Sequence, residues 1–489
     1  MHLFVEYARQ FARFSRNARL YLISNALSGV TAGILLVLYN LYLASLGYGA
    51  DFIGTVLFVG TVGAGLAIFP AGIIIDRFSG KAILIWSSAL IGLAGAGQIL
   101  FRQPLPLLAS AFVAGIGLAF ILVINAPFLT LNSTPDERPQ LFSMNIAISL
   151  ITLVLGEILG GILPIWLRGI PWLMAPLPSS ASGLLASQPY PRSYQIALLF
   201  AGIIAAPSFI PLFLMSSTKP RQDQEGRDDH ERDQSALYRS SWRSMAASIA
   251  SFKAWFLAIR RAQWKKVLAS PFFVLLLVQI FIGLGAGLFI PYFNLFFVKH
   301  LGASSALFGF IDAGANTITA LLTLAAPWLA LHIGKVNTMV WTRLISIPLM
   351  ITIGLTGLLP LAAALYLFRQ GAMDMSNGIL QVFSMEAVSE QKRGLANSGY
   401  QAAFQGAEAI TTPIGGLMIV HLGYSSVFLL APIFYLPAIG ILWGKFGRGR
   451  GRRDDDKTAP RAINTTPNSS KVFPTASGVN SANQANPPN

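Results

Sequence analysis

The chain contains one apolar stretch twice: GILLVLYNLYLASLGYGADFIG at residues 33–54 and GLFIPYFNLFFVKHLGASSALFG at residues 287–309. The first copy shares residue types with the second, about 255 residues later, at five positions: Gly33, Asn40, Leu46, Gly47 and Gly54 recur as Gly287, Asn294, Leu301, Gly302 and Gly309. The same spacing relates later pairs: Gly80-Lys81, Trp86 and Gly160-Gly161 recur as Gly334-Lys335, Trp341 and Gly415-Gly416. Because the spacing hardly drifts across a whole half, the sequence predicts one fold built from two copies of a unit.

The composition indicates a membrane protein. The 489 residues are 54% hydrophobic and 11% charged, whereas soluble domains are roughly 25% charged. Apolar runs of about 20 residues, long enough to cross a hydrocarbon core, begin near Leu20, Phe52, Ala82, Leu105, Leu141, Tyr194, Pro271, Ala303, Thr338, Leu361, Leu395 and Ser425. A backbone in lipid must satisfy its own hydrogen bonds, so each run is helical. We predict an all-α membrane protein with about twelve transmembrane helices in two pseudo-symmetric six-helix bundles.

The basic residues predict which side of the membrane each connector occupies. The net charge is +15, but Lys and Arg are dispersed among connectors and tails, which argues against a nucleic-acid partner. They fill the even-numbered connectors, for example at Arg77, Arg138 and Lys392. By the positive-inside rule both termini and the middle linker are cytoplasmic. No cleavable signal is evident, so we expect an integral protein of the inner or plasma cell membrane.

Composition shifts divide the chain into five parts. We predict a cytoplasmic N-terminal segment (1–19), an N-terminal six-helix bundle (20–216), a cytoplasmic linker (217–268), a C-terminal six-helix bundle (269–444) and a disordered cytoplasmic tail (445–489). The linker begins with a charged stretch that cannot bury a core. It continues as an amphipathic basic helix, which is typical of a segment lying on the anionic inner leaflet. A helix that packs against the bundle is the competing interpretation.

The connector after the second span reads GIIIDRFSGK at residues 72–81. It resembles the signature loop of the major facilitator superfamily, Gly-x-x-x-Asp-Arg-x-Gly-Arg-Lys, although Ser79 and Gly80 depart from that pattern. The resemblance implies two bundles that rock around a midplane site, with a gating loop at Asp76, Arg77 and Lys81 and its second copy at Lys335. Solvated residues at the membrane border are the competing interpretation.

Polar side chains form stripes along several spans. The stripes follow the helical spacing of three and four residues and consist of Asn145, Ser149, Thr152 and Gly156; Asp312, Asn316, Thr319 and Thr323; Gln370, Asp374, Asn377 and Gln381; and Gln401, Gln405, Glu408 and Thr412. Asn145 is aligned with Gln401 in this comparison, so the first and last stripes are expected to face each other across a cavity. An acid near the bilayer midplane costs about 2.5–3.5 kcal/mol, so water or a partner must meet these groups.

We therefore predict a set of substrate-binding or coupling residues from the stripes and from the spans that line the cavity in the resembled family. They are Asn25, Asn40, Asn125, Asn145, Glu157, Asn294, Asp312, Asn316, Gln370, Asp374, Asn377, Gln401, Gln405 and Glu408. A carboxylate in a cavity can exchange a proton for a cation or a hydrogen-bonding substrate. Structural hydrogen bonding to neighbouring amides is the competing explanation.

The residue types also limit the chemistry. The chain has no cysteine and five scattered histidines, and neither Gly80-Lys81 nor Gly334-Lys335 belongs to a phosphate-binding Walker loop, so we expect no metal site, no cofactor and no catalytic residue. We predict a secondary active transporter that works by alternating access, specifically proton-coupled efflux of a drug-like or amphipathic solute. Its partners would be this small molecule, protons and the lipid bilayer. The alternatives are a nutrient-uptake carrier and a membrane receptor or assembly partner that does not transport. The oligomeric state stays open, a monomer included.

Overall fold

The computed structural model describes residues 11–134, 136–176, 185–216, 270–386 and 393–447. The predicted linker, most of the predicted tail and the first ten residues lie outside these ranges, as do the side chains of Asp76 and Arg77. The regular structure in the described ranges is helical, which confirms the predicted all-α class.

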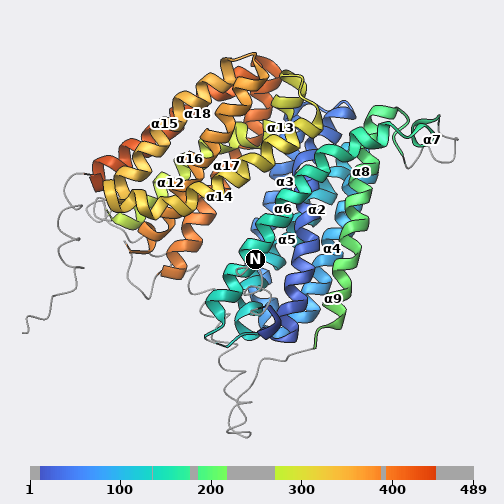
Figure 1. The fold of residues 1–489 in the computed structure, drawn as a ribbon, viewed down its shortest axis with the longest axis horizontal. Helices are drawn as coiled ribbons and strands as arrows, with labels where there is room; N and C mark the ends of the chain where they lie inside the picture. The colour runs from blue at the N-terminus through green and yellow to red at the C-terminus, as the bar shows by residue number, and fades with distance from the viewer. Residues whose placement is uncertain (1–10, 135, 177–184, 217–269, 387–392, 448–489) are drawn as a thin grey trace, which may run out of the picture. The chain divides into compact units, whose positions relative to one another are not determined.

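The first half of the chain forms one bundle of helices (Figure 1). Its helices are α2 (Arg16–Ser45), α3 (Ala50–Arg77), α4 (Gly80–Leu100), α5 (Pro104–Leu131), α6 (Arg138–Arg168), the short α7 (Pro171–Met174), α8 (Pro189–Ala205) and, after the one-turn η1 (Ala206–Ser208), α9 (Phe209–Leu214). Local sequence explains several starts. The Ser15 and Ser79 side chains cap α2 and α4 by accepting from the Ala18 and Ala82 amides, which satisfies backbone donors that a helix start leaves free.

The second half repeats this arrangement. Its helices are α12 (Pro271–Phe289), η2 (Ile290–Tyr292), α13 (Phe293–Leu295), η3 (Phe296–His300), α14 (Ser305–Ile333), α15 (Lys335–Leu355), α16 (Leu359–Glu386), α17 (Arg393–Leu422), α18 (Tyr424–Leu442) and η5 (Trp443–Gly447). The break after α12 has a local cause, because Pro291 has no N–H and its ring disfavours a continuous helix. Segments η2, α13 and η3 follow, so the seventh span ends in irregular helical turns.

Ten segments of the described chain are long and apolar enough to cross a membrane. Helices α16 and α17, of 28 and 30 residues, are equally long but fall outside this set. They carry the predicted stripes that begin at Gln370 and Gln401, which lower their hydropathy. A polar transmembrane helix needs a hydrated or protein-lined face, so the two exceptions indicate where such a face lies.

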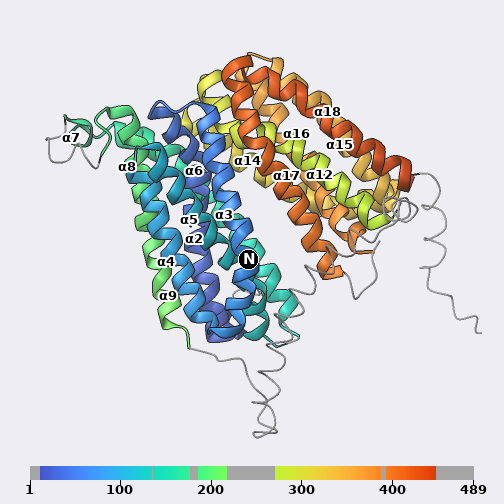
Figure 2. The same ribbon diagram turned by 180° about the vertical axis from the view of Figure 1, so that it is seen from behind.

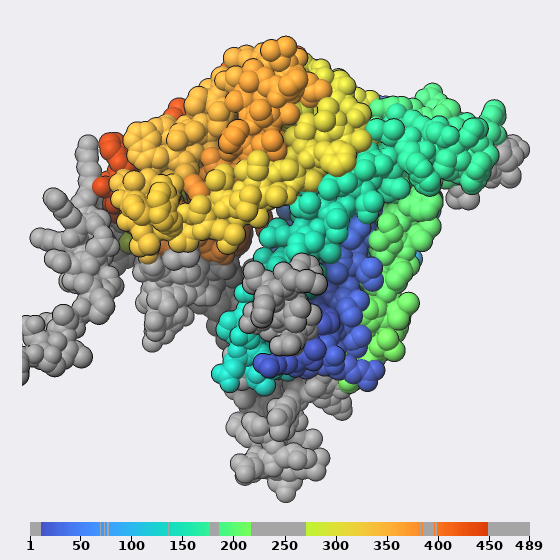
Figure 3. Space-filling view, viewed as in Figure 1, coloured from blue at the N-terminus to red at the C-terminus, as the bar shows by residue number. Residues whose placement is uncertain are grey.

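The bundles meet at two crossings that involve repeated glycines. Helix α3 packs against α17, and α6 packs against α14 (Figure 2; Figure 3). At the first crossing Gly54 lies against the backbone of Thr412 and Pro413, and Gly416 lies against Ala50. At the second, Gly309 lies against the Glu157 backbone, and Gly161 lies against Ser305. A side chain would overlap these backbones, so only glycine permits such close approach between membrane helices.

The repeated asparagines join the bundles beside these crossings. The Asn40 amide donates to the Pro291 carbonyl at 2.7 Å, and Asn294 donates to the Val37 carbonyl at 3.2 Å. Both asparagines are buried, with 7% and 4% of their surface exposed. The repeated Gly47 explains itself differently: it ends α2 with a φ of 98°, a left-handed conformation that favours glycine. We call the end of the bundles that contains the 46–49 and 301–304 turns the closed end.

We expect Gly416→Ala to lower the melting temperature of the purified protein in detergent. The new methyl group would overlap the Ala50 backbone, and overpacking of this kind costs about 1–3 kcal/mol. The matched control is Gly440→Ala on α18, because nothing lies within 4 Å of its added Cβ. Equal melting temperatures for the two variants would contradict the role given to the glycine crossing.

Candidate functional site

The carboxylate of Asp374 on α16 is held on both sides by amides of its own helix. Gln370 donates to one carboxylate oxygen at 2.7 Å, and Asn377 donates to the other at 3.2 Å. These residues follow one face of α16 at the predicted spacing. Asp374 is half-buried and Asn377 is exposed, so the stripe is accessible from outside the bundle core.

Two buried arginines stand behind these amides. Arg369 donates to the Gln370 side-chain oxygen at 3.0 Å, and Arg343 on α15 donates to the Asn377 side-chain oxygen at 2.9 Å. Only 1% of Arg369 and 2% of Arg343 is exposed, and both act electrostatically on Asp374. Each amide thus passes the pull of an arginine to one carboxylate oxygen. A buried charge needs this kind of pairing, so Asp374 serves first as the counter-ion of the two arginines.

Arg343 was missed by the sequence-based reasoning. The ninth span was expected to stay at the lipid-packed periphery, and no role was assigned to an arginine within it. A signal was available, since Arg343 is the one ionisable residue inside an apolar span, and such residues are rare and usually paired. Its partners on α16, Ser376 at 2.8 Å and Asn377, could not be read from the sequence because they lie on another helix.

Helix α17 carries a second polar face with a different character. Gln401 and Gln405 are exposed and Glu408 is half-buried, whereas Thr412, one turn nearer the closed end, is only 3% exposed. The backbone of Glu408 packs against Gly287. Its side chain is not held between two amides as the Asp374 carboxylate is. The α17 stripe therefore passes from accessible to buried as it approaches the closed end.

The polar face of α6 does not face α17 as expected. The Asn25 amide on α2 donates to the Asn145 side-chain oxygen and to the Ser149 hydroxyl, both at 2.8 Å. This stripe therefore lies against α2 inside its own bundle. The sequence alignment of the stripes was also wrong by one residue, because the equivalent Gly33 and Gly287 contact the backbones of Leu153 and Glu408.

Four predicted residues meet at the crossing of α6 and α14 or beside it. The Asn316 amide on α14 donates to one Glu157 carboxylate oxygen at 2.7 Å, across the two bundles. One turn earlier on α14, Asp312 accepts from the Tyr366 hydroxyl at 2.8 Å. Glu157 is fully buried and Asp312 is 8% exposed, and the two carboxyls act on each other electrostatically. The crossing thus contains two acids within a dry contact between bundles.

The remaining predicted residues lie in separate places. Asn40 and Asn294 belong to the closed end, and Asn125 is half-buried on α5. The Lys81 ammonium donates to the Phe213 and Met215 carbonyls, both at 2.7 Å, where it caps the end of α9 within its own bundle. Lys335 is the first residue of α15, and Asp76 and Arg77 end α3.

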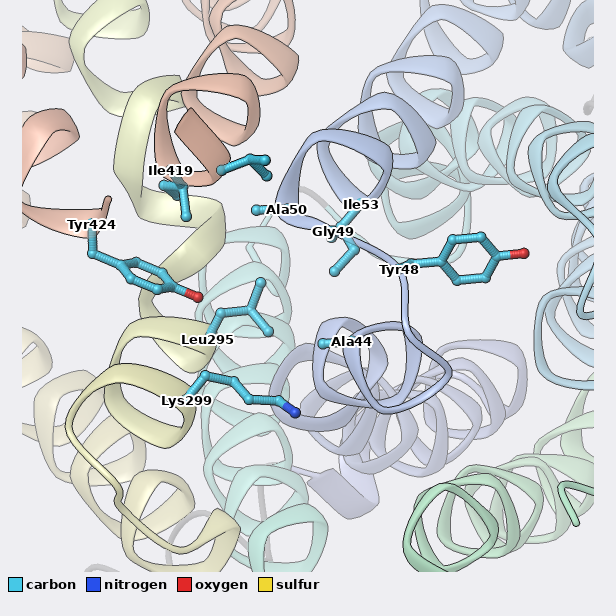
Figure 4. A pocket seen from close by; sticks show the side chains of 10 residues that line it. Ala44, Tyr48, Gly49, Ala50, Ile53, Leu295, Lys299, Ile419 and Tyr424 are labelled. Carbon is cyan, nitrogen blue, oxygen red and sulfur yellow. The ribbon is translucent and has the colours of Figure 1, made fainter. Parts of the chain in front are cut away.

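A pocket of about 270 Å³ opens at the closed end between the two bundles (Figure 4). Lys299 is the charged residue among the ten that line it, and its ammonium group and the Tyr424 hydroxyl point towards the pocket centre. The Tyr48 ring points away, and its hydroxyl donates to the Arg102 carbonyl at 2.6 Å. Burial raises the pKa of Tyr48, which keeps this donor protonated. None of the residues predicted for the site lines this pocket. In the described part of the chain no group of three or more His, Cys, Asp or Glu could hold a metal ion.

We expect Arg343→Met and Asp374→Asn to lower thermal stability separately, by about 3–5 kcal/mol for a broken buried pair. The double variant should lose less than the sum, with a coupling energy of about 0.5–3 kcal/mol, because neither charge is then left unpaired. Denaturation of the four proteins in detergent measures this cycle. Asp51→Asn, on α3 of the other bundle, combined with Arg343→Met is the control and should be additive. An additive Arg343–Asp374 cycle would contradict the proposed network.

Comparisons with known proteins agree with this architecture. The family model described as Major Facilitator Superfamily matches residues 21–385 and 275–478. No curated protein matches the chain. A bacterial homologue of the human lysosomal transporter Spinster, solved in an inward-facing and unoccupied conformation, is similar in fold with a TM-score of 0.64 and 14% identity, over 88% of this chain and 96% of the other.

Two further structures share the fold. The nucleoside transporter NupG has a TM-score of 0.63 and 12% identity over 88% of this chain and 100% of its own. A D-xylose-proton symporter has a TM-score of 0.61 and 15% identity over 87% of this chain and 96% of its own. The resemblance seen in residues 72–81 is confirmed by the family match, which covers both repeats. The chain belongs to the major facilitator superfamily.

Proposed function

We propose that the protein is a secondary active transporter that moves a small solute by alternating access and is driven by protons. The observation that carries this proposal is the arrangement of α16 and α17. Both have polar faces that are accessible away from the closed end, on helices long enough to span the membrane. Family membership supports the same conclusion. The two faces offer a solute a hydrated surface between bundles that touch at their other end.

The closed end is the outer end in this proposal. The positive-inside pattern puts the connectors at Arg77, Arg138 and Lys335 in the cytoplasm, and these lie at the opposite ends of the helices from the closed end. The described conformation then exposes the α16 and α17 faces to the cytoplasm. A carrier in this state can load a solute from inside, which supports the predicted direction of efflux.

The acids on the two faces would play different roles. Asp374 is tied to two amides that are backed by arginines, so it orders the surface rather than exchanging partners. Glu408 has more freedom, and it lies beside the exposed Gln405 and the half-buried Phe404. A carboxylate, amides and an aromatic ring together suit an amphipathic solute with a hydrogen-bond donor or a positive charge. We propose Gln401, Gln405 and Glu408 as the part of the surface that contacts it.

Reconstitution into proteoliposomes tests the function directly. We expect solute flux from a panel of amphipathic cations, nucleosides and sugars to depend on protein and to increase with an imposed pH gradient. A protonophore should abolish the increase without damaging the protein. Flux of a sugar or nucleoside into cells would favour the uptake alternative. Saturable binding without flux for every compound would contradict transport and favour the receptor alternative.

Glu408→Gln should reduce the transport efficiency for the best solute by about tenfold or more. The reason is the loss of a charge-assisted hydrogen bond, which contributes about 1.5–3 kcal/mol. Asp136→Asn is the matched control, since Asp136 is an exposed acid in the turn between α5 and α6. Initial rates across a range of solute concentrations separate binding from turnover. Equal efficiencies for Glu408→Gln and Asp136→Asn would remove Glu408 from the solute site.

A further inference from the structure

The Glu157 carboxyl lies in the contact between α6 and α14, where the two bundles join. None of its surface is exposed. One carboxylate oxygen accepts from Asn316 at 2.7 Å, while the other has no hydrogen-bond partner. Backbone contacts surround it, because Gly309 packs on the Glu157 carbonyl and the Ser305 hydroxyl donates to the Gly161 carbonyl at 3.0 Å. Water cannot reach the group without separation of the two helices.

The titratable groups that face Glu157 offer no positive charge. From α14, Asp312 acts on it as a second acid. From α16, Tyr366 lies close enough to act on Glu157 but donates its hydroxyl to Asp312. Helices α2 and α8 also pack against α6, and no lysine or arginine among the described residues acts on the carboxyl from them or from elsewhere. An ionised Glu157 would therefore be a buried anion next to another acid.

The physical consequence is a preference for one protonation state in this conformation. A buried carboxylate without a cation and with one hydrogen bond is costly, and the ordinary response is to bind a proton. The neutral acid keeps the bond from Asn316 on its carbonyl oxygen. Separation of α6 from α14 would admit water and remove the penalty on the anion. Protonation and the contact between the bundles therefore favour each other.

The other crossing is the internal control for this reasoning. Gly54 contacts Thr412 there as Gly309 contacts Glu157 here, and Gly416 contacts Ala50 as Gly161 contacts Ser305. Thr412 thus occupies the position that is equivalent to Glu157. Its hydroxyl donates to the Glu408 carbonyl at 2.8 Å within α17, so this position is neutral and satisfied. The duplicated fold therefore carries a titratable group in only one of these two equivalent positions.

We propose that Glu157 is the binding site of the coupling proton, and that it acts by controlling the contact between α6 and α14. This inference rests on the proposed function, since it assigns the proton site of that transporter. The proton binds away from the surface of Gln401, Gln405 and Glu408, so the coupling is conformational and does not depend on competition between proton and solute for one carboxylate. The proton stabilises the closed end, and its release allows the closed end to open.

The absence of native cysteine makes the test direct. Gln103→Cys and Leu358→Cys place spin labels on exposed turns of the two bundles at the closed end, and pulsed electron paramagnetic resonance measures their separation without any solute. With Glu157 intact, we expect the short-distance population to fall as pH rises, over about two pH units for a single titrating group. Glu157→Gln preserves the contact with Asn316 and should keep the short distance at every pH.

Two further variants on the same labelled background distinguish the explanations. Thr412→Val changes the equivalent neutral position and should leave the pH dependence intact. Asp312→Asn should shift the transition to lower pH, because it removes a negative charge that favours the bound proton. It also provides a second measurement if Glu157→Gln folds poorly.

Retention of the pH dependence in Glu157→Gln would overturn the proposal, as would its loss in Asp312→Asn, since the proton site would then be Asp312. Label distances that do not change with pH while Glu157 is intact would overturn it as well. These outcomes are independent of the flux assay, so transport could stand even if this proton site fails.

Discussion

The structure depends on backbone contacts between helices of opposite bundles at glycines. Lipid offers little hydrophobic drive for helix association, so close packing must supply it. Gly54 and Gly416 permit this at one crossing, and Gly161 and Gly309 permit it at the other. Both crossings lie near the same ends of their helices, where Asn40 and Asn294 add hydrogen bonds between the bundles. Contact is therefore concentrated at the closed end, which leaves the farther parts of α16 and α17 available to water.

This distribution of contacts explains how the polar groups differ. Polar side chains near the closed end, such as Asn294 and Glu157, are buried and bridge the bundles. Those farther along the helices either remain exposed, as Gln405 does, or are fixed within one bundle, as Asp374 is. The same residue types thus serve contact, solute access and internal charge pairing according to depth. A buried arginine pair behind α16 is compatible with an accessible stripe because the amides between them link the two.

The sequence was sufficient for the fold because a duplicated apolar pattern constrains both the number of units and their relation. It also contained the glycine pairs, since those positions recur at one spacing. It was insufficient for the site because side-chain partners lie on different helices. Periodicity placed Asn145 on a polar face but could not show that Asn25 of α2 occupies that face. It likewise could not show that Arg343 reaches Asn377. An alignment based on polar stripes slipped by one residue, whereas glycine contacts with the backbone define the register without ambiguity.

Duplication also makes departures from symmetry informative. Equivalent positions that serve packing alone have the same requirements, and the glycines of both crossings are accordingly identical. Glu157 and Thr412 occupy equivalent positions with the same burial, so packing does not demand an acid there. A fully buried carboxyl with one hydrogen bond destabilises the contact whenever it is ionised. A group that makes the contact conditional on a proton adds nothing to a rigid assembly, but it is useful in one whose halves must separate and rejoin. The asymmetry therefore lies where the proposed cycle requires control.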